Sequence, residues 1–116
     1  RMLSCAESPV HSNWKEAIVN SRETDTVFLN QQGRPALRAL KTELTAGLEP
    51  LGKFNIMEHM ANLQRLYFAG DMEAAIPLQG QVGGRIDSVL SAQDVIDETM
   101  TGFHTAINNL HRQYAQ

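Results

Sequence analysis

The C-terminal stretch from Ala92 to Tyr114 constrains the fold most strongly, because its large apolar side chains recur every three or four residues. These side chains are Ile96, Met100, Phe103, Ile107, Leu110 and Tyr114. Such spacing places them on one face of an α-helix. Ser91, with Asp94 three residues later, has the form of a capping box. We therefore predict a helix over Ala92–Tyr114, with Gly102 as a weak point that costs about 1 kcal/mol against alanine.

Shorter helices are predicted along the rest of the chain. Apolar residues on one face indicate a helix over about Asn13–Ser21, with Ser12 as its N-cap. A second helix carries Leu37, Leu40, Leu44 and Leu48 and is ended by Gly47 and Pro50. A third covers about Asn55–Ala69 and is capped by Gly70. Two more are predicted from Asp71, as N-cap, to about Ile76, and from Val82 to Leu90.

Strand-like sequence is scarce in this chain. The β-branched and aromatic residues at Thr24–Leu29 predict one strand, and Met2–Leu3 has the composition of the end of another. Gln31–Gly33 is expected to form a turn. Two short strands are too few for an independent sheet. They either pair as a small ribbon or belong to a larger sheet outside this chain, and the fold class is predicted to be mainly α.

Composition restricts the class of protein. The chain has 116 residues, 42% of them hydrophobic, and a net charge of −3, with no basic stripe of the kind that binds nucleic acid. No apolar run reaches the roughly 20 residues that cross a bilayer. A single cysteine, Cys5, fits a reducing compartment, so we expect a cytoplasmic protein with neither a nucleic-acid nor a membrane partner. The chain starts at Arg1 rather than methionine, so we expect a fragment, a processed product or a trimmed form of a longer chain.

The segment Leu78–Gly84, LQGQVGG, is the most distinctive loop. Gly80 lets a flat ligand or a neighbouring backbone approach closely, and the glutamines on either side offer both hydrogen-bond donors and acceptors. Amide groups from Val82 onward would favour an anionic or electron-rich ligand if a helix began there. A tight turn between packed helices explains the same glycines without any ligand. The residues alone leave both interpretations open.

No complete catalytic or metal-binding motif is present. The four histidines, His11, His59, His104 and His111, are scattered, and none has a ligand partner at helical spacing. We expect His11 to pack or cap in its loop. Cys5 has no cluster of positive charge around it and is not expected to act as a nucleophile. We therefore predict neither a catalytic residue nor a metal site in this chain.

Three separated blocks nevertheless resemble the nitronate monooxygenase (2-nitropropane dioxygenase) family of flavoproteins. The opening block is similar to the family's G-T-R-F-L…E-S-x-x-H segment and following helix at Arg1, Leu3, Glu7, Ser8, His11, Lys15 and Glu16. The second is similar to its D-T, strand, G-R-P-A-R-A-L stretch at Asp25, Thr26, Gly33, Arg34, Pro35, Ala36, Arg38, Ala39 and Leu40. The third is similar to its G-D, short helix, A-G-Q-x-x-G-L-I segment at Gly70, Asp71, Gly80, Gln81, Gly84 and Ile86.

This resemblance implies a fold and a cofactor. It implies the C-terminal part of a (β/α)₈ TIM barrel with an appended helical subdomain: 1–23 as the end of the barrel and the following helix, 24–76 as the subdomain, and 77–116 as the flavin-proximal loop and C-terminal helices. The cofactor would be FMN, with its phosphate held upstream of Arg1. Leu78, Gln79, Gly80 and Gln81 would lie near the flavin ring. Gln79 departs from the family's small residue, and Arg85 from its leucine.

The resemblance also implies an activity for the whole enzyme. This is oxidation of an alkyl nitronate by flavin and dioxygen, with the catalytic histidine outside this chain. Flavin-dependent enoyl-acyl-carrier-protein reductases share the layout, so an enoyl thioester is the alternative small-molecule substrate. A non-catalytic helical interaction module is a further alternative. We expect the 116 residues alone to bind FMN weakly or not at all, and their apolar helix faces to favour self-association into a homo-oligomer.

Overall fold

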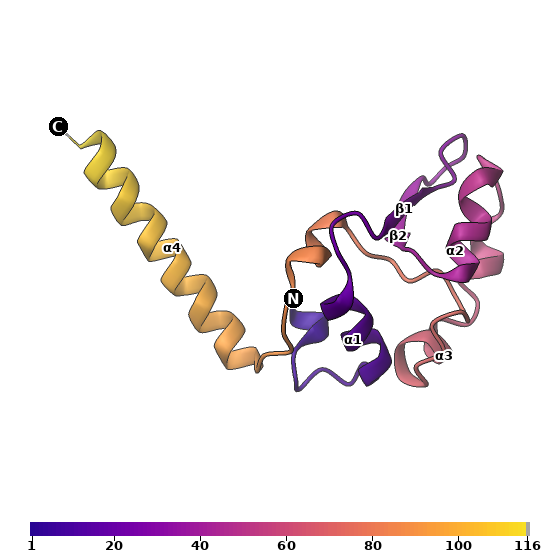
Figure 1. Cartoon of the computed structure of the whole chain (residues 1–116), viewed down its shortest axis with the longest axis horizontal. Helices are drawn as coiled ribbons and strands as arrows, with labels where there is room; N and C mark the ends of the chain where they lie inside the picture. The colour runs from indigo at the N-terminus through magenta and orange to yellow at the C-terminus, as the bar shows by residue number, and fades with distance from the viewer. Residues whose placement is uncertain (116) are drawn as a thin grey trace.

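A computed structural model describes residues 1–115, which form a folded body and one long helix that projects from it (Figure 1). The molecule measures 55 × 32 × 20 Å along its principal axes. Its regular elements are α1 (Ser12–Asn20), β1 (Thr26–Leu29), β2 (Leu37–Leu40), α2 (Glu43–Leu48), α3 (Leu63–Phe68) and α4 (Ala92–Tyr114). Short 3-10 turns lie at η1 (Met2–Ser4), η2 (Glu49–Leu51), η3 (Ile56–His59) and η4 (Gln81–Arg85).

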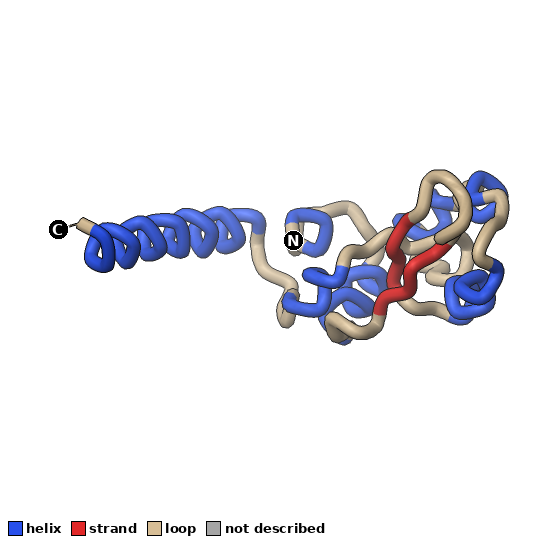
Figure 2. The backbone as a smooth tube through the Cα atoms, turned by 90° about the horizontal axis from the view of Figure 1, so that it is seen from above, coloured by secondary structure: helices blue, strands red, loops and turns tan. Residues whose placement is uncertain are grey.

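The two strands form an antiparallel ribbon within the body (Figure 2). Thr26 pairs with Leu40 and Leu29 with Leu37. The segment after Ile76 runs along the other edge of β2, where the Leu40 amide donates to the Pro77 carbonyl at 2.9 Å and Leu78 bridges to Ala39. The ribbon therefore fixes the start of the glycine-rich loop.

Two apolar clusters hold the body together. The first contains Val10, Trp14, Ile18, Leu40, Leu66 and Ala75. The second contains Val27, Leu29, Ala39, Leu48 and Ile76. Neighbouring residues of β2, and again of the segment at 75–76, enter different clusters because successive side chains of an extended chain point to opposite sides. The extended segments thus join the two clusters into one body.

Several predicted elements are confirmed. The mainly helical class with one or two strands is confirmed, as are the bounds of α4 and, within a residue or two, those of α1 and β1. The Ser91 hydroxyl caps α4 by accepting from the Asp94 amide at 3.0 Å. Gly70 follows α3 at φ +73°, the left-handed conformation expected of a glycine after a helix. The cap of α1, however, is His11 rather than Ser12.

The strand predicted at Met2–Leu3 and the helix predicted from Leu37 are both wrong. Met2–Ser4 forms a 3-10 turn, and Leu37–Leu40 forms β2, the true partner of β1. Leucines that recur after three or four residues are typical of an amphipathic helix. A short strand beside an apolar core can also place leucines at such positions. The helix starts only at Glu43, because Thr42 and Thr45 form a reciprocal capping box there.

The long helix predicted over Asn55–Ala69 is broken in two. Met60 packs against the second apolar cluster, whereas Leu63 and Leu66 pack in the first. A single straight helix would not place these side chains in both clusters. The His59 carbonyl is also taken by the Ile76 amide at 3.0 Å. The short helix predicted from Asp71 is likewise a series of turns, in which the Asp71 carboxylate accepts from the Glu73 amide.

The helix predicted over Val82–Leu90 is also wrong in kind and length. The chain forms the 3-10 turn η4, which ends at Arg85, and then runs irregularly to Ser91. Gly84 allows this turn to pack directly on the backbone of Arg22 and Glu23. The position of the turn is therefore set by backbone contact with the segment after α1.

Candidate functional site

The loop Leu78–Gln81 emerges from the edge of β2. The Gln79 amide donates to the Arg38 carbonyl at 3.3 Å, and the preceding residues, Ile76 and Pro77, are buried. Leu78 itself is 41% exposed. A buried anchor followed by an exposed side chain is the arrangement expected of a loop that meets a ligand or another part of a protein.

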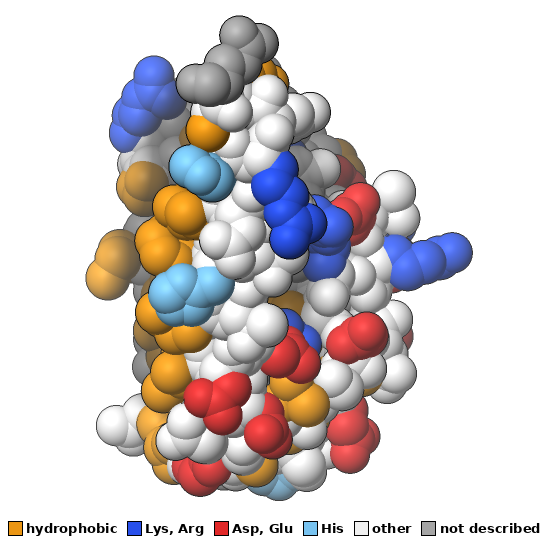
Figure 3. All heavy atoms as spheres, turned by 90° about the vertical axis from the view of Figure 1, so that its left-hand side faces the viewer, with side chains coloured by type: hydrophobic (Ala, Val, Ile, Leu, Met, Phe, Trp, Pro, Cys, Tyr) orange, Lys and Arg blue, Asp and Glu red, His pale blue; other side chains and the backbone are white. Residues whose placement is uncertain are grey.

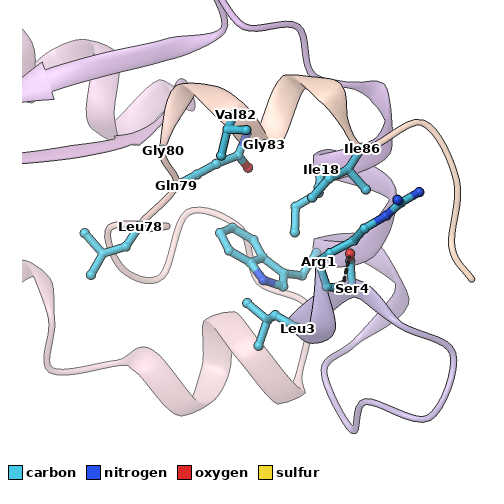
Figure 4. A pocket seen from close by; sticks show the side chains of 11 residues that line it. Arg1, Leu3, Ser4, Ile18, Leu78, Gln79, Gly80, Val82, Gly83 and Ile86 are labelled. Atoms are coloured by element: carbon cyan, nitrogen blue, oxygen red, sulfur yellow. Dashed lines mark hydrogen bonds between the residues drawn. The ribbon is translucent and has the colours of Figure 1, made fainter. Parts of the chain in front are cut away.

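A hollow of about 190 Å³ lies beside this loop, between η1, α1 and η4 (Figure 4). Its walls are mainly apolar. They are formed by Arg1, Leu3, Ser4, Trp14, Ile18, Leu78, Gln79, Gly80, Val82, Gly83 and Ile86. Two segments far from this loop in the sequence, η1 and α1, therefore converge on the loop that the sequence singles out.

Two buried polar atoms of this hollow have no hydrogen-bond partner among the described residues. The Gln79 side chain donates through Nε2 to the Ser21 hydroxyl at 3.0 Å, but its Oε1 is buried and unpaired. The indole Nε1 of Trp14, a fully buried residue, is unpaired as well. Leaving such a group without a partner costs about 1–3 kcal/mol. Both atoms are buried within the packed side chains, so neither is presented at the surface of the hollow as it stands.

The glycines of this region differ in whether the surrounding chain leaves room for a side chain. A Cβ on Gly80 would meet nothing within 4 Å, so the described chain does not itself require glycine there. A Cβ on Gly84 would overlap the backbone of Arg22 and Glu23, and one on Gly83 would overlap the Gln79 side chain. Gly83 and Gly84 therefore serve packing, whereas Gly80 leaves open space beside the hollow.

The guanidinium of Arg1 is already engaged at the rim of this hollow. Its Nη1 donates to a Glu98 carboxylate oxygen at 2.7 Å, and its Nη2 lies 4.0 Å from the Asp87 carboxylate. Both acids reduce the positive charge that Arg1 presents to the hollow.

The residues considered for catalysis lie apart from one another. His11 caps α1, where its Nδ1 accepts from the Asn13 amide at 3.1 Å, as expected for a capping residue. His59 packs edge-on against Phe54, and His104 is exposed on α4. Cys5 is a buried free thiol. Within residues 1–115, no three His, Cys, Asp or Glu side chains are grouped so as to hold a metal ion.

One carboxylate of the body contacts the first residue of α4. The Glu7 side chain accepts from the Ala92 amide at 2.8 Å. This hydrogen bond, helped by one from the Glu7 amide and one from Cys5, lowers the pKa of the Glu7 carboxyl below its ordinary value of 4.5. Desolvation and the nearby Asp94 charge oppose the shift. Glu7 thus keeps its charge at the N-terminus of α4.

The structure brings together three of the four residues predicted near the flavin. Leu78, Gln79 and Gly80 line the hollow, whereas Gln81 does not. Their contact with a flavin stays a prediction. Sequence reasoning missed the other walls, chiefly Trp14, and it missed Ser21, which accepts from the Gln79 side chain. The only signal for Trp14 was its place as the single tryptophan of the chain, on the apolar face of the first predicted helix.

None of the described helices combines the length and the apolarity needed to span a bilayer.

Comparisons with known proteins identify the fold. No protein-family model and no curated protein matches the sequence. Solved structures do match, among them FabK from Thermotoga maritima, with a TM-score of 0.84 and 26% identity over 97% of this chain. A point mutant of the same FabK matches with a TM-score of 0.81 and 26% identity, again over 97% of this chain.

The match extends over part of FabK only. This chain spans 38% of one FabK chain and 35% of the other. It therefore has the fold of part of a TIM-barrel enzyme, as its resemblance to the flavin barrels implied.

Proposed function

We propose that this chain is part of an FMN-dependent oxidoreductase and that Leu78, Gln79, Gly80 and Gln81 lie beside the flavin ring. The observation that carries the proposal is the hollow at this loop, in a chain that matches FabK over 97% of its length. FabK is a flavin-dependent enoyl-acyl-carrier-protein reductase with a TIM-barrel fold. Both the sequence resemblance and the structural likeness thus support flavin chemistry.

The residues that line the hollow fit one edge of a flavin ring. The pyrimidine edge of a flavin carries carbonyl acceptors and an N–H donor. The unpaired Nε1–H of Trp14 and the unpaired Oε1 of Gln79 are buried, and a local movement that exposed them to the hollow would make them complementary to such an edge. Leu78 supplies apolar surface, and Gly80 leaves room for close approach.

The hollow is too small to hold the whole cofactor. Its volume of about 190 Å³ falls below the roughly 300–1,000 Å³ of ligand pockets. Bound FMN would supply the transfer of a hydride. The described residues would orient one edge of the ring and exclude water from it, and none of them is assigned a proton transfer.

Two substrate classes are candidates for the whole enzyme. The likeness to FabK favours reduction of an enoyl thioester with NADH or NADPH. Nitronate oxidation with dioxygen is the second candidate, supported by the glycine-arginine-proline block at Gly33–Pro35. In a protein that joins these residues to a complete barrel, consumption of NAD(P)H with an enoyl thioester supports the first reaction. Oxygen uptake with a nitronate supports the second.

Ring contact is testable on the 116-residue chain itself. With FMN at about 1 mM, where even weak binding is populated, we expect NMR shifts of the Trp14 indole N–H and of the amides of Leu78–Gln81. Riboflavin, which has the ring without the phosphate, should shift the same signals. The Gln79→Leu variant should lose most of the effect, whereas the control Gln93→Leu on α4 should keep it.

Two results would contradict this proposal. NMR shifts confined to α4, or no shifts in the loop with either flavin, would show that the flavin ring does not contact the loop. Tight, stoichiometric FMN binding in a fluorescence titration would contradict the expectation that this hollow holds only one edge of the cofactor.

A further inference from the structure

The Gln79 side chain connects the loop of the proposed flavin site to the end of α1. Its Nε2 donates to the Ser21 hydroxyl at 3.0 Å, across 58 residues of sequence. The Gln79 backbone amide donates to the Arg38 carbonyl of β2 at 3.3 Å. One residue therefore joins the loop to two separate elements of the body, and a smaller side chain at this position would not reach Ser21.

The hydrogen bonds of Ser21 fix the orientation of the Gln79 amide. The Ser21 hydroxyl donates to the Ile18 carbonyl, in the last turn of α1, through a buried hydrogen bond of 2.7 Å. A hydroxyl has one proton to donate, so Ser21 meets Gln79 as an acceptor. Gln79 therefore turns Nε2 toward Ser21 and Oε1 away from it.

Gly83 leaves the room that this side chain occupies. A Cβ on Gly83 would lie 2.6 Å from Nε2 and 2.7 Å from Cδ of Gln79. The Gly83 amide donates to the Gly80 carbonyl at 3.0 Å, which closes the first turn of η4. Gln79 and Gly83 lie next to each other in Figure 4. The glutamine thus packs against the turn that follows it in the sequence.

Packing alone does not account for a glutamine at this position. Its Oε1 is buried without a hydrogen-bond partner among the described residues. Such an atom lowers stability, whereas an apolar side chain would fill the same space without an unpaired oxygen. The amide adds the hydrogen bond from Nε2 to Ser21, which fixes the loop at the residue just before Gly80 and Gln81.

We propose that Gln79 is a positioning residue, whose hydrogen bond to Ser21 holds Gly80 and Gln81 in place beside the flavin ring. This inference rests on the proposed function, because the ring is the group that the loop would meet. Gln79 acts through the loop backbone, since its Nε2 is bound to Ser21 and its Oε1 is buried. Ser21 does not line the hollow, so its substitution separates positioning from direct contact.

The Ser21–Gln79 hydrogen bond joins two neutral groups. Charged side chains lie at the surface on the face shown in Figure 3, and the ion pair of Arg1 with Glu98 is exposed. Salt screens interactions between exposed charges. The loss of flavin contact that Ser21→Ala causes should therefore be equal at low and high salt.

The first part of the test needs no flavin. NMR spectra of the 116-residue chain are compared for Ser21→Ala, Gln79→Ala and the double variant. Ser21→Ala should shift the amides of Gly80 and Gln81, and should let the Gln79 side-chain amide protons exchange faster with water. Once residue 79 is alanine, Ser21→Ala should shift the loop amides no further. The control Ser12→Ala, at an exposed serine at the other end of α1, should leave them unchanged.

The second part adds FMN at about 1 mM, where even weak binding is populated. Ser21→Ala should reduce the FMN-induced shifts of Gly80 and Gln81 roughly fivefold, the factor by which one net hydrogen bond changes an equilibrium. Gln79→Ala should reduce them equally, and the double variant no more than either. Ser12→Ala should again match the unmodified chain.

Gly83→Ala disturbs the same hydrogen bond from the other side. Its Cβ should displace the Gln79 side chain from Ser21 and reproduce the loop shifts of Ser21→Ala. Together with Gln79→Ala, which empties that space, it should have little further effect. Circular dichroism checks that every variant keeps its fold.

The outcomes separate this inference from the proposed function. FMN-induced shifts that Ser21→Ala leaves unchanged or enlarges would mean that Gln79 contacts the flavin itself, and would overturn the positioning role. Additive effects of Ser21→Ala and Gln79→Ala on the flavin-free loop amides would overturn it as well. An unmodified chain without FMN-induced shifts would instead overturn the proposed function, while coupled flavin-free shifts would still support the hold of Ser21 on the loop.

Discussion

At the scale of single residues, the glycines around the hollow separate packing from ligand access. Gly84 lies against the backbone of Arg22 and Glu23, which cannot move aside as a flexible side chain does. Gly80 has φ −78° and free space around its Cα, so its conformation and its surroundings both tolerate a side chain. The two glycines stand four residues apart, and we expect them to respond oppositely to the same substitution.

We predict that Gly84→Ala lowers the free energy of unfolding by about 1–3 kcal/mol, the range for an overpacked site. Gly80→Ala should change it by less than about 0.5 kcal/mol, as at unconstrained surface positions. Urea denaturation followed by Trp14 fluorescence measures both, because Trp14 is the single tryptophan and lies in the core. Equal destabilisation by the two substitutions would contradict the packing role assigned to Gly84.

At the scale of elements, the residues that cap the ends of helices predicted the structure better than the spacing of apolar residues. The Ser91–Asp94 cap and the glycine after α3 were predictable, because each depends on a few neighbouring residues. Leu37 and Leu40 misled because their strand depends on pairing with Thr26–Leu29, a contact that sequence spacing does not contain. The capping box at Thr42 was a local signal that would have placed the start of α2 correctly.

The candidate site was predictable to the same limited extent. The loop Leu78–Gln81 stood out by its composition and its family resemblance. The wall formed by Trp14 and the hydrogen bond from Gln79 to Ser21 did not stand out, because both residues reach the loop only through tertiary packing of α1 against η4. The unpaired indole N–H and glutamine oxygen are likewise properties of burial, which no motif encodes.

The junction between the body and α4 predicts a pH response at this scale. Because the Glu7 pKa is lowered in the folded chain, its contribution to stability is full above pH 4.5. It is lost as the pH falls through the lowered folded value. The Ala92 amide, which donates to Glu7, should therefore shift in NMR with a midpoint below pH 4.5.

The control for this response is Glu7→Gln, which keeps an acceptor near Ala92 but does not titrate in this range. Its Ala92 amide shift should stay flat through the same acid transition. A residual shift that persists in this variant and disappears in Asp94→Asn would belong to the neighbouring Asp94 carboxylate and not to Glu7. A midpoint at or above 4.5 in the unmodified chain would contradict a pKa lowered by the hydrogen bond.

At the scale of the whole molecule, the body and α4 have very different support. The body has two apolar clusters joined by the extended chain segments, whereas α4 buries only Val95 and is attached mainly through Glu7 and Arg1. Stability is not uniform in such a molecule, because a region with few buried contacts opens at low cost. The stability of the body should therefore depend little on α4.

We predict that a chain ending at Ser91 keeps the fold of the body. Loss of one buried valine, Val95, costs about 1.5–3 kcal/mol at most, and the core around Trp14 contains no side chain from α4. Near-ultraviolet circular dichroism and the NMR shift of the Trp14 indole should be close to those of the full chain. In the full chain, hydrogen exchange should be faster for the amides of α4 than for those of β1 and β2, because α4 has few buried contacts. A shortened chain without fixed tertiary signals, or exchange in α4 as slow as in the strands, would instead mean that α4 and the body support each other.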